Sequence, residues 1–349
     1  MKKVDIKQCI ITITRNCNLR CDFCYAKKTG YIKDKFIDYY NIKKIVDFCT
    51  EAKVNFIVLT GGEPTLYHNV MDVIKYITSK EHKMSTAIVT NGIKLSDYNF
   101  CKELIDNGVS YIDISLKGKD GKSCAEITGQ DCFLQQMEAI HNLSLLPVEF
   151  TCSMVLTHDN ISTFCEGIKS AYKNGARQFS FTFALDNEKS NINDFEYLQK
   201  NNPFILIEAF IAQIDKLNEI TEGEWWIEYT FPLCIYTEDQ LSLLEGKLAA
   251  PCHIFKRNGI TFDTKMNLLP CSMHIDHKIG QFGTDFSSYK EFEKIIECDP
   301  YKSVLNSLSK LPSDECKLCK YFESCYGGCS IFWKNCSFET LKEFKKQRI

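Results

Sequence analysis

The feature that most constrains the fold of this chain is a regular alternation of short apolar segments with longer amphipathic segments over roughly its first 185 residues. Short runs rich in β-branched and aromatic residues are typical of buried strands, and apolar residues at helical spacing are typical of helices that cover a sheet. We predict strands at Cys9–Thr14, Phe56–Leu59, Ser85–Thr90, Tyr111–Ser115, Val148–Leu156 and Gln178–Phe183. We predict helices at Tyr39–Ala52, Val70–Ser79, Asn99–Asn107, Phe133–Leu143 and Ser162–Asn174. This order predicts an α/β fold of repeated β-α units around a parallel sheet.

Past this region the pattern changes. A stretch from residue 186 to 202, rich in Asn, Asp, Glu and Lys, is typical of a surface connection that leaves the sheet. We predict one helix at Phe204–Leu217 and mixed or extended chain at Trp225–Ile235. From Pro251 onward the apolar periodicity weakens and cysteines accumulate, which indicates a small domain organised by metal rather than by an apolar core. We therefore expect three parts, at 1–200, 201–250 (a bridging helical region) and 251–349.

Charge and composition exclude several classes of protein. A net charge of -3 with 25% charged and 44% hydrophobic residues fits neither a disordered chain nor a basic nucleic-acid binder. The N-terminal segment has no long apolar core and no small-residue cleavage site, so it reads as a strand rather than a signal peptide. No run approaches the roughly 20 apolar residues that span a bilayer. We expect a cytoplasmic protein with no nucleic-acid or membrane partner.

The nineteen cysteines point to metal chemistry. A disulfide framework is improbable in the reducing cytosol, so ligation of a metal or cluster is the better interpretation. Cys17, Cys21 and Cys24 follow the first predicted strand directly, where α/β sheets place their chemistry. Three thiolates this close can bind one face of an iron-sulfur cubane and leave one iron open for a substrate. A structural zinc site would instead want four ligands, usually in CxxC pairs.

The spacing Cys17-x3-Cys21-x2-Cys24, with Phe23 before the last cysteine, resembles the motif of the radical S-adenosylmethionine (radical SAM) superfamily. The segment after the second strand, Thr60-Gly61-Gly62-Glu63-Pro64, resembles that family's GGEP motif, which binds the methionine ammonium. The resemblance implies that Asn91 and Ser115, at the ends of the third and fourth strands, contact the ribose or carboxylate of the cofactor. Lys117 stands where family members often have an acid.

This resemblance implies a fold, a reaction and cofactors. The fold is a partial (β/α)6 TIM-like barrel over residues 1–200. S-adenosylmethionine chelates the open iron of a 4Fe-4S cluster, and the reduced cluster splits it to a 5′-deoxyadenosyl radical that takes hydrogen from the substrate. A flavodoxin or ferredoxin type reductant is implied as a partner.

The C-terminal spacing Cys316-x2-Cys319-x5-Cys325-x3-Cys329 resembles the core of the SPASM domain, the auxiliary-cluster module of peptide-modifying radical enzymes. Its leading and final cysteines match Cys252, Cys271 and Cys336, although Met266 replaces a family glycine. The resemblance implies two auxiliary 4Fe-4S clusters. The distal one is held by Cys316, Cys319, Cys325 and Cys336. The nearer one is held by Cys252, Cys271 and Cys329, with His253 and His274 as candidates for a fourth ligand. A four-thiolate zinc site stays open as the alternative.

Most of the remaining cysteines are expected to be small buried apolar residues. Cys234 is the exception, because it lies just ahead of the SPASM-like segment, where peptide epimerases of this group use a thiol to return hydrogen to the substrate radical. The resemblance therefore makes Cys234 a candidate hydrogen donor.

The substrate implied by this resemblance is a ribosomally made peptide, modified by epimerisation or by a carbon-carbon or carbon-sulfur (thioether) cross-link. An anaerobic sulfatase maturase is disfavoured because Ser272, not an acid, follows Cys271. The triad begins near the N-terminus, so we expect the leader of a precursor peptide to bind the barrel edge by strand addition, or to bind a separate leader-binding protein. The alternatives are a radical SAM dehydrogenase or rearrangement enzyme acting on a small metabolite, and a non-catalytic iron-sulfur electron carrier or zinc scaffold.

Overall fold

The computed structural model describes residues 5–27, 35–186, 188–228, 231–249, 252–296 and 298–347. Its strands form one sheet in the order β10-β9-β8-β1-β2-β3-β4-β5-β6-β7. The first seven are β1 (Gln8–Thr14), β2 (Phe56–Gly61), β3 (Ser85–Thr90), β4 (Tyr111–Leu116), β5 (Glu149–Leu156), β6 (Phe179–Phe183) and β7 (Trp225–Ile227). The last three are β8 (Gly259–Phe262), β9 (Asn267–Leu269) and β10 (Gly280–Gln281). Pairing is parallel from β8 through β1 to β7, and antiparallel for β9 and β10.

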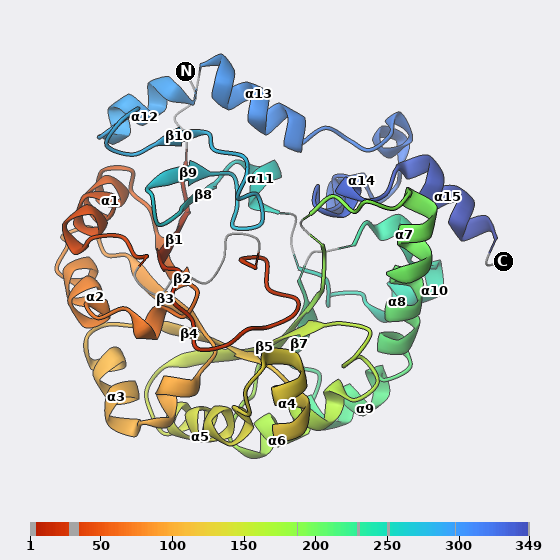
Figure 1. The fold of residues 1–349 in the computed structure, drawn as a ribbon, viewed down its shortest axis with the longest axis horizontal. Coiled ribbons are helices and arrows are strands. Elements are labelled where there is room, and N and C mark those ends of the chain that lie inside the picture. The colour runs from red at the N-terminus through yellow and green to blue at the C-terminus, as the bar shows by residue number, and fades with distance from the viewer. Residues whose placement is uncertain are drawn as a thin grey trace.

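The helices that follow the first strands are α1 (Tyr39–Glu51), α2 (Val70–Thr78), α3 (Tyr98–Asp106), α4 (Gly121–Thr128), α5 (Phe133–Ser144) and α6 (Phe164–Lys173). They lie outside the ring that the curved sheet forms, and the red segment after β1 lies inside it (Figure 1). Residues along β1 alternate between full and partial burial, as expected when one face packs on helices and the other faces the interior. Among the described residues no pairing joins β7 to β10, so the barrel is open.

The predicted α/β fold with a parallel sheet is confirmed. All six predicted strands and all five predicted helices are present, with ends shifted by at most two residues. The helix α4 was missed because it is short and begins at a glycine. It is held at its start by a capping box, in which the Asp120 side chain accepts from the Ser123 amide and the Ser123 side chain accepts from the Asp120 amide.

The region after β6 differs from the sequence-based prediction in two places. The predicted surface connection contains a helix, α7 (Asp194–Lys200), whose cap is the side chain of Asn193. The single helix predicted at Phe204–Leu217 is two helices, α8 (Pro203–Ile211) and α9 (Ile214–Thr221). At the break, the Gln213 side chain donates to the carbonyl of Ile161 in another loop. Tertiary contacts of this kind are invisible to local periodicity.

The C-terminal third contributes to the sheet and to the apolar core. Its helices are α11 (His253–Lys256), α12 (Tyr289–Ile295), α13 (Asp299–Leu308), α14 (Phe322–Cys325) and α15 (Phe338–Lys346), and α10 (Glu238–Leu243) precedes them. On α1, the ring of Phe48 lies 6.2 Å from Phe262, 5.7 Å from Phe282, 5.8 Å from Phe286 and 5.4 Å from Phe292. Aromatic residues of this segment therefore pack against the barrel helix α1, and the prediction of a small domain organised by metal is not tested by these contacts. These aromatic residues are widely spaced in sequence, so they gave no periodic signal.

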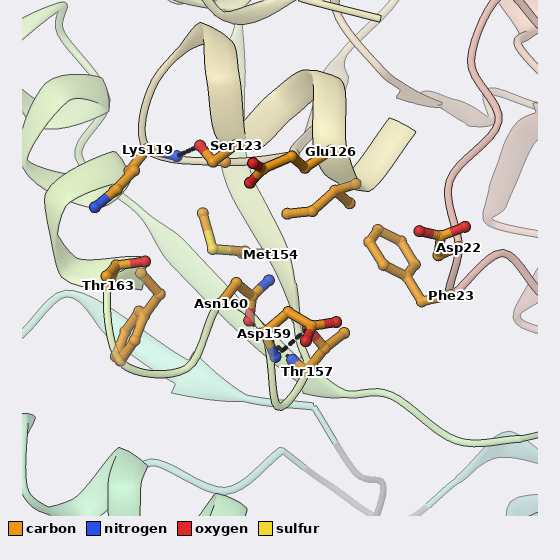
Figure 2. Close-up of a pocket in the computed structure, with 13 residues that line it drawn as sticks. Asp22, Phe23, Lys119, Ser123, Glu126, Met154, Thr157, Asp159, Asn160 and Thr163 are labelled. Carbon is orange, nitrogen blue, oxygen red and sulfur yellow. Dashed lines mark hydrogen bonds between the residues drawn. The ribbon is translucent and has the colours of Figure 1, made fainter. Parts of the chain in front are cut away.

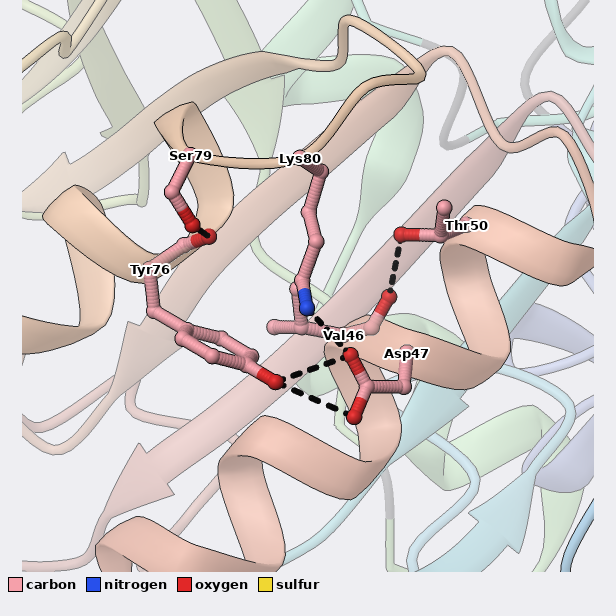
Figure 3. A network of polar contacts seen from close by, with 6 residues as sticks. All are labelled: Val46, Asp47, Thr50, Tyr76, Ser79 and Lys80. Atoms are coloured by element: carbon pink, nitrogen blue, oxygen red, sulfur yellow. Dashed lines mark hydrogen bonds and ion pairs between the residues drawn. The ribbon is translucent and has the colours of Figure 1, made fainter.

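Polar contacts join neighbouring helices on the outer surface. Between α1 and α2, the Tyr76 hydroxyl donates to both carboxylate oxygens of Asp47, at 2.9 and 3.1 Å, and Lys80 pairs with the same carboxylate (Figure 3). Within the described part of the chain, no helix has both the length and the apolar character needed to cross a bilayer.

Candidate active site and the cysteine groups

The three cysteines of the N-terminal triad come together in the loop after β1. Burial raises the pKa of Cys17 to about 11, and the neighbouring thiols of Cys21 and Cys24 add to this effect. The amide of Leu19 donates to the Cys17 sulfur at 3.4 Å. The triad therefore forms a compact, partly desolvated group of thiols.

The end of α4 anchors this loop. The carbonyls of Thr128 and Ile127 accept from the amides of Arg20, at 2.8 Å, and Asp22, at 3.0 Å. The last carbonyls of a helix have no partner within the helix. Here they hold the backbone on both sides of Cys21.

The two glycines after β2 allow a close approach to the start of the triad loop. The amides of Gly62 and Glu63 donate to the carbonyls of Thr14, at 2.8 Å, and Asn16, at 2.7 Å. A Cβ atom at Gly61 would lie 2.3 Å from the Thr14 oxygen, and one at Gly62 would lie 2.3 Å from the Asn16 oxygen. Side chains are therefore excluded at both positions.

Glu63 joins the end of β2 to the end of β3. Its side chain is 1% exposed, and its Oε1 accepts from the amide and hydroxyl of Thr65 and from the hydroxyl of Thr90. Its Oε2 accepts from the Asn91 amide. The next residue, Pro64, begins a short 3-10 helix, η1 (Pro64–Leu66). The carboxylate of the GGEP-like segment thus positions two loops of the site.

Asn91 and Gln136 extend these connections. The Asn91 side chain donates to the side chain of Asn18, at 2.8 Å, and so ties β3 to the triad loop. Gln136, buried on α5, donates to the carbonyls of Asn91, at 2.7 Å, and Ser115, at 2.9 Å. Sequence reasoning missed Gln136, although a glutamine at an inward-facing helix position is itself a signal of a buried polar contact.

Lys117 places a positive charge next to the triad. It is 6% exposed, its Nζ donates to the Ser115 hydroxyl at 2.6 Å, and it lies 5.4 Å from the ring centre of Phe23. Burial raises the pKa of Cys21, and the charge of Lys117 opposes that rise. The predicted cofactor residues Phe23 and Ser115 therefore share one cationic neighbour.

A cavity of about 440 Å³ adjoins the triad loop. Phe23 and Met154 supply apolar walls, and Ser123 of α4 lies opposite the loop that contains Thr157 and Asn160 (Figure 2). That loop is ordered by the Asn160 side chain, which accepts from the Thr157 amide and donates to the Val155 carbonyl, each at 2.8 Å. No motif marked this loop in the sequence.

Inside the barrel, Asp113 of β4 carries a perturbed carboxyl group. Burial raises its pKa to about 6, and the charge of Glu228 adds to the rise while hydrogen bonds from Ser153 and the charge of Lys117 oppose it. Among the described residues its Oδ1 has no hydrogen-bond partner. The interior thus offers a carboxyl group that can exchange a proton near neutral pH.

Tyr25 links the triad to the C-terminal region. Burial raises its pKa to about 12, with the thiols of Cys24 and Cys271 adding to the rise and hydrogen bonds to Thr60 and Ser272 opposing it. A cavity of about 200 Å³ lies here, lined by residues that include Arg15, Tyr25, Gly62, Asp263 and Ser272. The GGEP-like segment and the C-terminal region therefore share one small cavity.

Three of the predicted auxiliary ligands form a second cysteine group. Burial raises the pKa of Cys271 to about 12, and the thiols of Cys329 and Cys252 add to the rise. The Nε2 of His253 bonds the Pro270 carbonyl at 2.9 Å. His274 contacts Ser330, next to Cys329, and its Nδ1 is buried without a partner among the described residues. Burial lowers the pKa of His274 to about 3, so its ring is neutral.

A third group lies near α14. Cys234, Cys316, Cys319 and Cys325 line one cavity of about 290 Å³, and Cys336 lines another. The candidate hydrogen donor Cys234 thus lies with the C-terminal cysteines. Nowhere in the described ranges do three Cys, His, Asp or Glu side chains converge closely enough to hold a single metal ion. A cubane spreads its thiolates over separate irons and suits wider groups of this kind.

Comparison with known proteins identifies the barrel. The sequence model described as the radical SAM superfamily matches residues 11–171, which include the triad, the GGEP-like segment, Asn91 and Ser115. A GTP 3′,8-cyclase from Clostridium perfringens (strain SM101) is 27% identical over 236 residues, 61% of this chain and 72% of that protein. A probable GTP 3′,8-cyclase from Thermoplasma volcanium is 28% identical over 223 residues, 61% of this chain and 64% of that protein.

Solved structures match over nearly the whole chain. Streptococcus suis SuiB bound to precursor peptide SuiA aligns with a TM-score of 0.68 and 15% identity, over 97% of this chain and 76% of SuiB. Native anSMEcpe with bound AdoMet aligns with a TM-score of 0.67 and 18% identity, over 98% of this chain and 97% of that chain. At these identities the likeness establishes the fold alone. The family model, which matches the segment that carries the triad and the GGEP-like motif, shows that residues 11–171 are a radical SAM domain and that the chain is a radical SAM enzyme.

Proposed function

We propose that this enzyme modifies a ribosomally made precursor peptide, by epimerisation or by a carbon-carbon or carbon-sulfur (thioether) cross-link. The observation that carries the proposal is the pair of cysteine groups beyond the barrel, one around Cys271 and one around Cys325. They occur on a fold that SuiB shares over 97% of this chain, and SuiB was solved with its precursor peptide. A further structure of anSMEcpe also contains a peptide.

Membership of the superfamily implies S-adenosylmethionine and one 4Fe-4S cluster, and the residues present fit both. Cys17, Cys21 and Cys24 supply three neighbouring thiols, and the cavity beside Phe23 and Met154 has the size and apolar walls that suit an adenosyl group. When bound, these groups supply an electron and a 5′-deoxyadenosyl radical that takes hydrogen from the substrate. The chain's part is to hold the triad loop through α4 and Gly62, and to place the charge of Lys117 beside it.

The two C-terminal groups are the proposed ligands of two auxiliary 4Fe-4S clusters. Burial raises the pKa of both Cys271 and Cys329, so both are protonated thiols in the absence of iron, and each must release its proton when iron binds. The proposed redox partner is an electron donor of the flavodoxin or ferredoxin type. The leader of the peptide is proposed to bind either the edge of the barrel or a separate leader-binding protein.

The small cavity between the GGEP-like segment and Ser272 is the proposed position of the reacting residue of the peptide. It lies between the triad and the nearer auxiliary group, because Tyr25 is close to Cys24 on one side and to Cys271 on the other. Ser272 offers a hydroxyl rather than a carboxylate here. The carboxyl group that lines this cavity is Asp263, and Asp113 inside the barrel is the carboxyl group whose raised pKa lies nearest to neutral among the described residues.

In a second candidate function, the enzyme acts on a small metabolite. The observation in its favour is the 27% identity to a GTP 3′,8-cyclase, which covers 61% of this chain. A nucleotide is therefore the alternative substrate to test alongside a peptide.

The test is anaerobic reconstitution followed by turnover. Purified protein is loaded with iron and sulfide, reduced, and incubated in heavy water with S-adenosylmethionine and either GTP or the synthetic product of a short reading frame beside the gene. We expect 5′-deoxyadenosine to form, together with a peptide that gains deuterium at an inverted centre or loses a pair of hydrogens on cross-linking. Conversion of GTP with an unchanged peptide would favour the second candidate. Zinc in place of iron at the triad, or no 5′-deoxyadenosine under any condition, would overturn both enzymatic functions.

The matched controls are the triad variant Cys17→Ala/Cys21→Ala/Cys24→Ala and the variant Cys298→Ala. Cys298 is an exposed cysteine whose thiol donates to the Lys294 carbonyl. The first variant should give no 5′-deoxyadenosine, and the second should match the unaltered protein.

A further inference from the structure

The cavity near α14 is lined by four cysteines from two distant parts of the chain. Cys316, Cys319 and Cys325 come from the SPASM-like segment. Cys234 comes from η3 (Leu233–Ile235), well ahead of that segment. The remaining lining is mostly apolar and aromatic, and includes Leu233, Phe322, Trp333 and Phe338. A sulfur-lined chamber with apolar walls is the environment in which proteins hold iron-sulfur clusters.

Cys336 does not belong to this chamber. It is 2% exposed and lines a neighbouring cavity, which shares Gly327, Trp333 and Phe338 with the chamber. Burial raises its pKa, and the thiol that adds to the rise is that of Cys234, whereas Cys316, Cys319 and Cys325 do not contribute. The Cys336 thiol donates to the carbonyl of the adjacent Ser337, at 3.2 Å. The residue to which the family resemblance assigns the fourth ligand position is therefore outside the cavity that the other three ligands line.

The backbone around Cys234 is fixed against the same group. The amide of Leu233 donates to the sulfur of Cys325 at 3.4 Å, the kind of contact that surrounds cluster sulfurs. The carbonyl of Cys234 accepts from Lys345 of α15 at 2.7 Å. These contacts hold η3 in place from two sides.

A run of left-handed residues divides the distal group from the nearer group. Tyr326, Gly327 and Gly328 have φ values of 48°, 83° and 78°. Cys325 before the run lines the chamber with Cys234, whereas Cys329 after it lies with Cys271 and Cys252. A Cβ at Gly328 would lie 2.9 Å from the Cα of Pro232, so only glycine lets the segment of Cys234 come this close.

We propose that Cys234 is the fourth thiolate ligand of the distal auxiliary cluster, in place of Cys336. The inference rests on the proposed function, since it requires that the C-terminal cysteines hold clusters. It replaces the role of hydrogen donor that family resemblance suggested for Cys234. A cluster with four protein thiolates has no open iron, so the distal cluster passes electrons and does not bind substrate.

The test counts iron in a background without the N-terminal cluster. In full-length Cys17→Ala/Cys21→Ala/Cys24→Ala protein, the further changes Cys234→Ala, Cys336→Ala, Cys316→Ala and Cys298→Ala are compared after anaerobic reconstitution. Iron and sulfide are counted, and the reduced proteins are compared by electron paramagnetic resonance and Mössbauer spectroscopy. We expect Cys234→Ala and Cys316→Ala each to lose about one cluster, roughly four irons per chain. Cys336→Ala and Cys298→Ala should keep their full complement.

A more conservative substitution tests the same ligand if Cys234→Ala fails to fold. Cys234→Ser keeps the volume and offers oxygen to iron, so the cluster should remain with a changed resonance spectrum, whereas Cys336→Ser should leave the spectrum unchanged. Loss of iron in Cys336→Ala overturns the inference and leaves the proposed clusters standing. Full iron and an unchanged spectrum in the Cys234 variants, with loss of peptide epimerisation in the otherwise unaltered protein, would restore the hydrogen donor. No loss in Cys316→Ala would overturn the proposed distal cluster itself.

Discussion

The carboxylate of Glu63 accepts a hydrogen bond of 2.7 Å from the backbone amide of Asn91. This contact joins the ends of two neighbouring parallel strands at the edge of the barrel where the triad lies. Since Asn91 also bonds Asn18 in the triad loop, one buried carboxylate positions the strand ends and, through Asn91, the cysteine loop.

Replacing Glu63 by Gln should destabilise the fold by about 2 kcal/mol, because a buried amide cannot accept from all four donors that now surround the carboxylate. The measurement is urea unfolding of the anaerobic apoprotein. The variant Thr65→Val is the control, since it removes one of those donors and keeps the carboxylate. If Glu63→Gln loses no more stability than Thr65→Val, the carboxylate does not hold the loops together.

Replacing Gly62 by Ala should weaken assembly of the N-terminal cluster. The added Cβ would lie 2.3 Å from the Asn16 oxygen, so the start of the triad loop must shift. We expect less iron at the triad and a loss of stability above about 2 kcal/mol. Gly280→Ala is the matched control, because neither Gly62 nor Gly280 has a positive φ and an added Cβ at Gly280 would come no closer than 3.6 Å to the atoms around it. Similar iron contents in the two variants would count against the close approach.

Filling the cavity shown in Figure 2 should block the binding of S-adenosylmethionine. Met154→Trp places a large ring between Phe23 and the Asn160 loop, and we expect binding of S-adenosylmethionine to weaken at least about tenfold, or 1.4 kcal/mol. Equilibrium dialysis of the reconstituted protein measures this. Leu134→Trp, at a position that is 77% exposed on α5, serves as the control. Unchanged binding in Met154→Trp would place the cofactor elsewhere.

The carboxyl group of Asp113 should make stability depend on pH. Because burial raises its pKa to about 6 from an ordinary value of 3.8, folding favours the protonated form. Its contribution to stability is complete below the unfolded-state pKa and is lost as the pH rises through about 6. Relative to Asp113→Asn, the free energy of unfolding of the unaltered protein should therefore fall by about 2 kcal/mol between pH 4 and pH 7.

Urea titrations of the two proteins at a series of pH values give this difference directly. Asp159→Asn is a suitable comparison, since Asp159 is an exposed carboxyl group in a loop. If the free energy of unfolding of the unaltered protein, relative to that of Asp113→Asn, stays constant or rises with pH, the fold does not favour the protonated carboxyl group.

Sequence patterns predicted the parts of this fold that are local. Strands such as β3 are rich in β-branched residues, and helices such as α6 have a clear apolar face, so both were located within two residues. The strand β7 has only three residues, and β8 pairs with β1 from far along the chain. The prediction of mixed or extended chain at Trp225–Ile235 covers β7 but does not assign it to the sheet, because three residues are too few to show alternation. The partner of β8 is set by tertiary packing and leaves no local signal.

The candidate site divides in the same way. The spacing of the triad and the GGEP-like segment predicted where sulfur and close backbone contacts would lie, because both depend on short stretches of chain. The sequence could not show that Glu63 faces inward to four donors, that Gln136 bridges Asn91 and Ser115, or that Cys234 joins Cys325. Each of these depends on side chains brought together by strands or helices that are distant in sequence.

The pairing of β8 with β1 bears on how the protein is made. While the ribosome is still extending the chain, β1 has one bare edge until residues 259–262 emerge, and an uncovered strand edge invites pairing with other molecules. The segment that carries the triad is therefore flanked by an unfinished sheet for most of synthesis. Iron insertion at the amino terminus should follow, rather than accompany, translation.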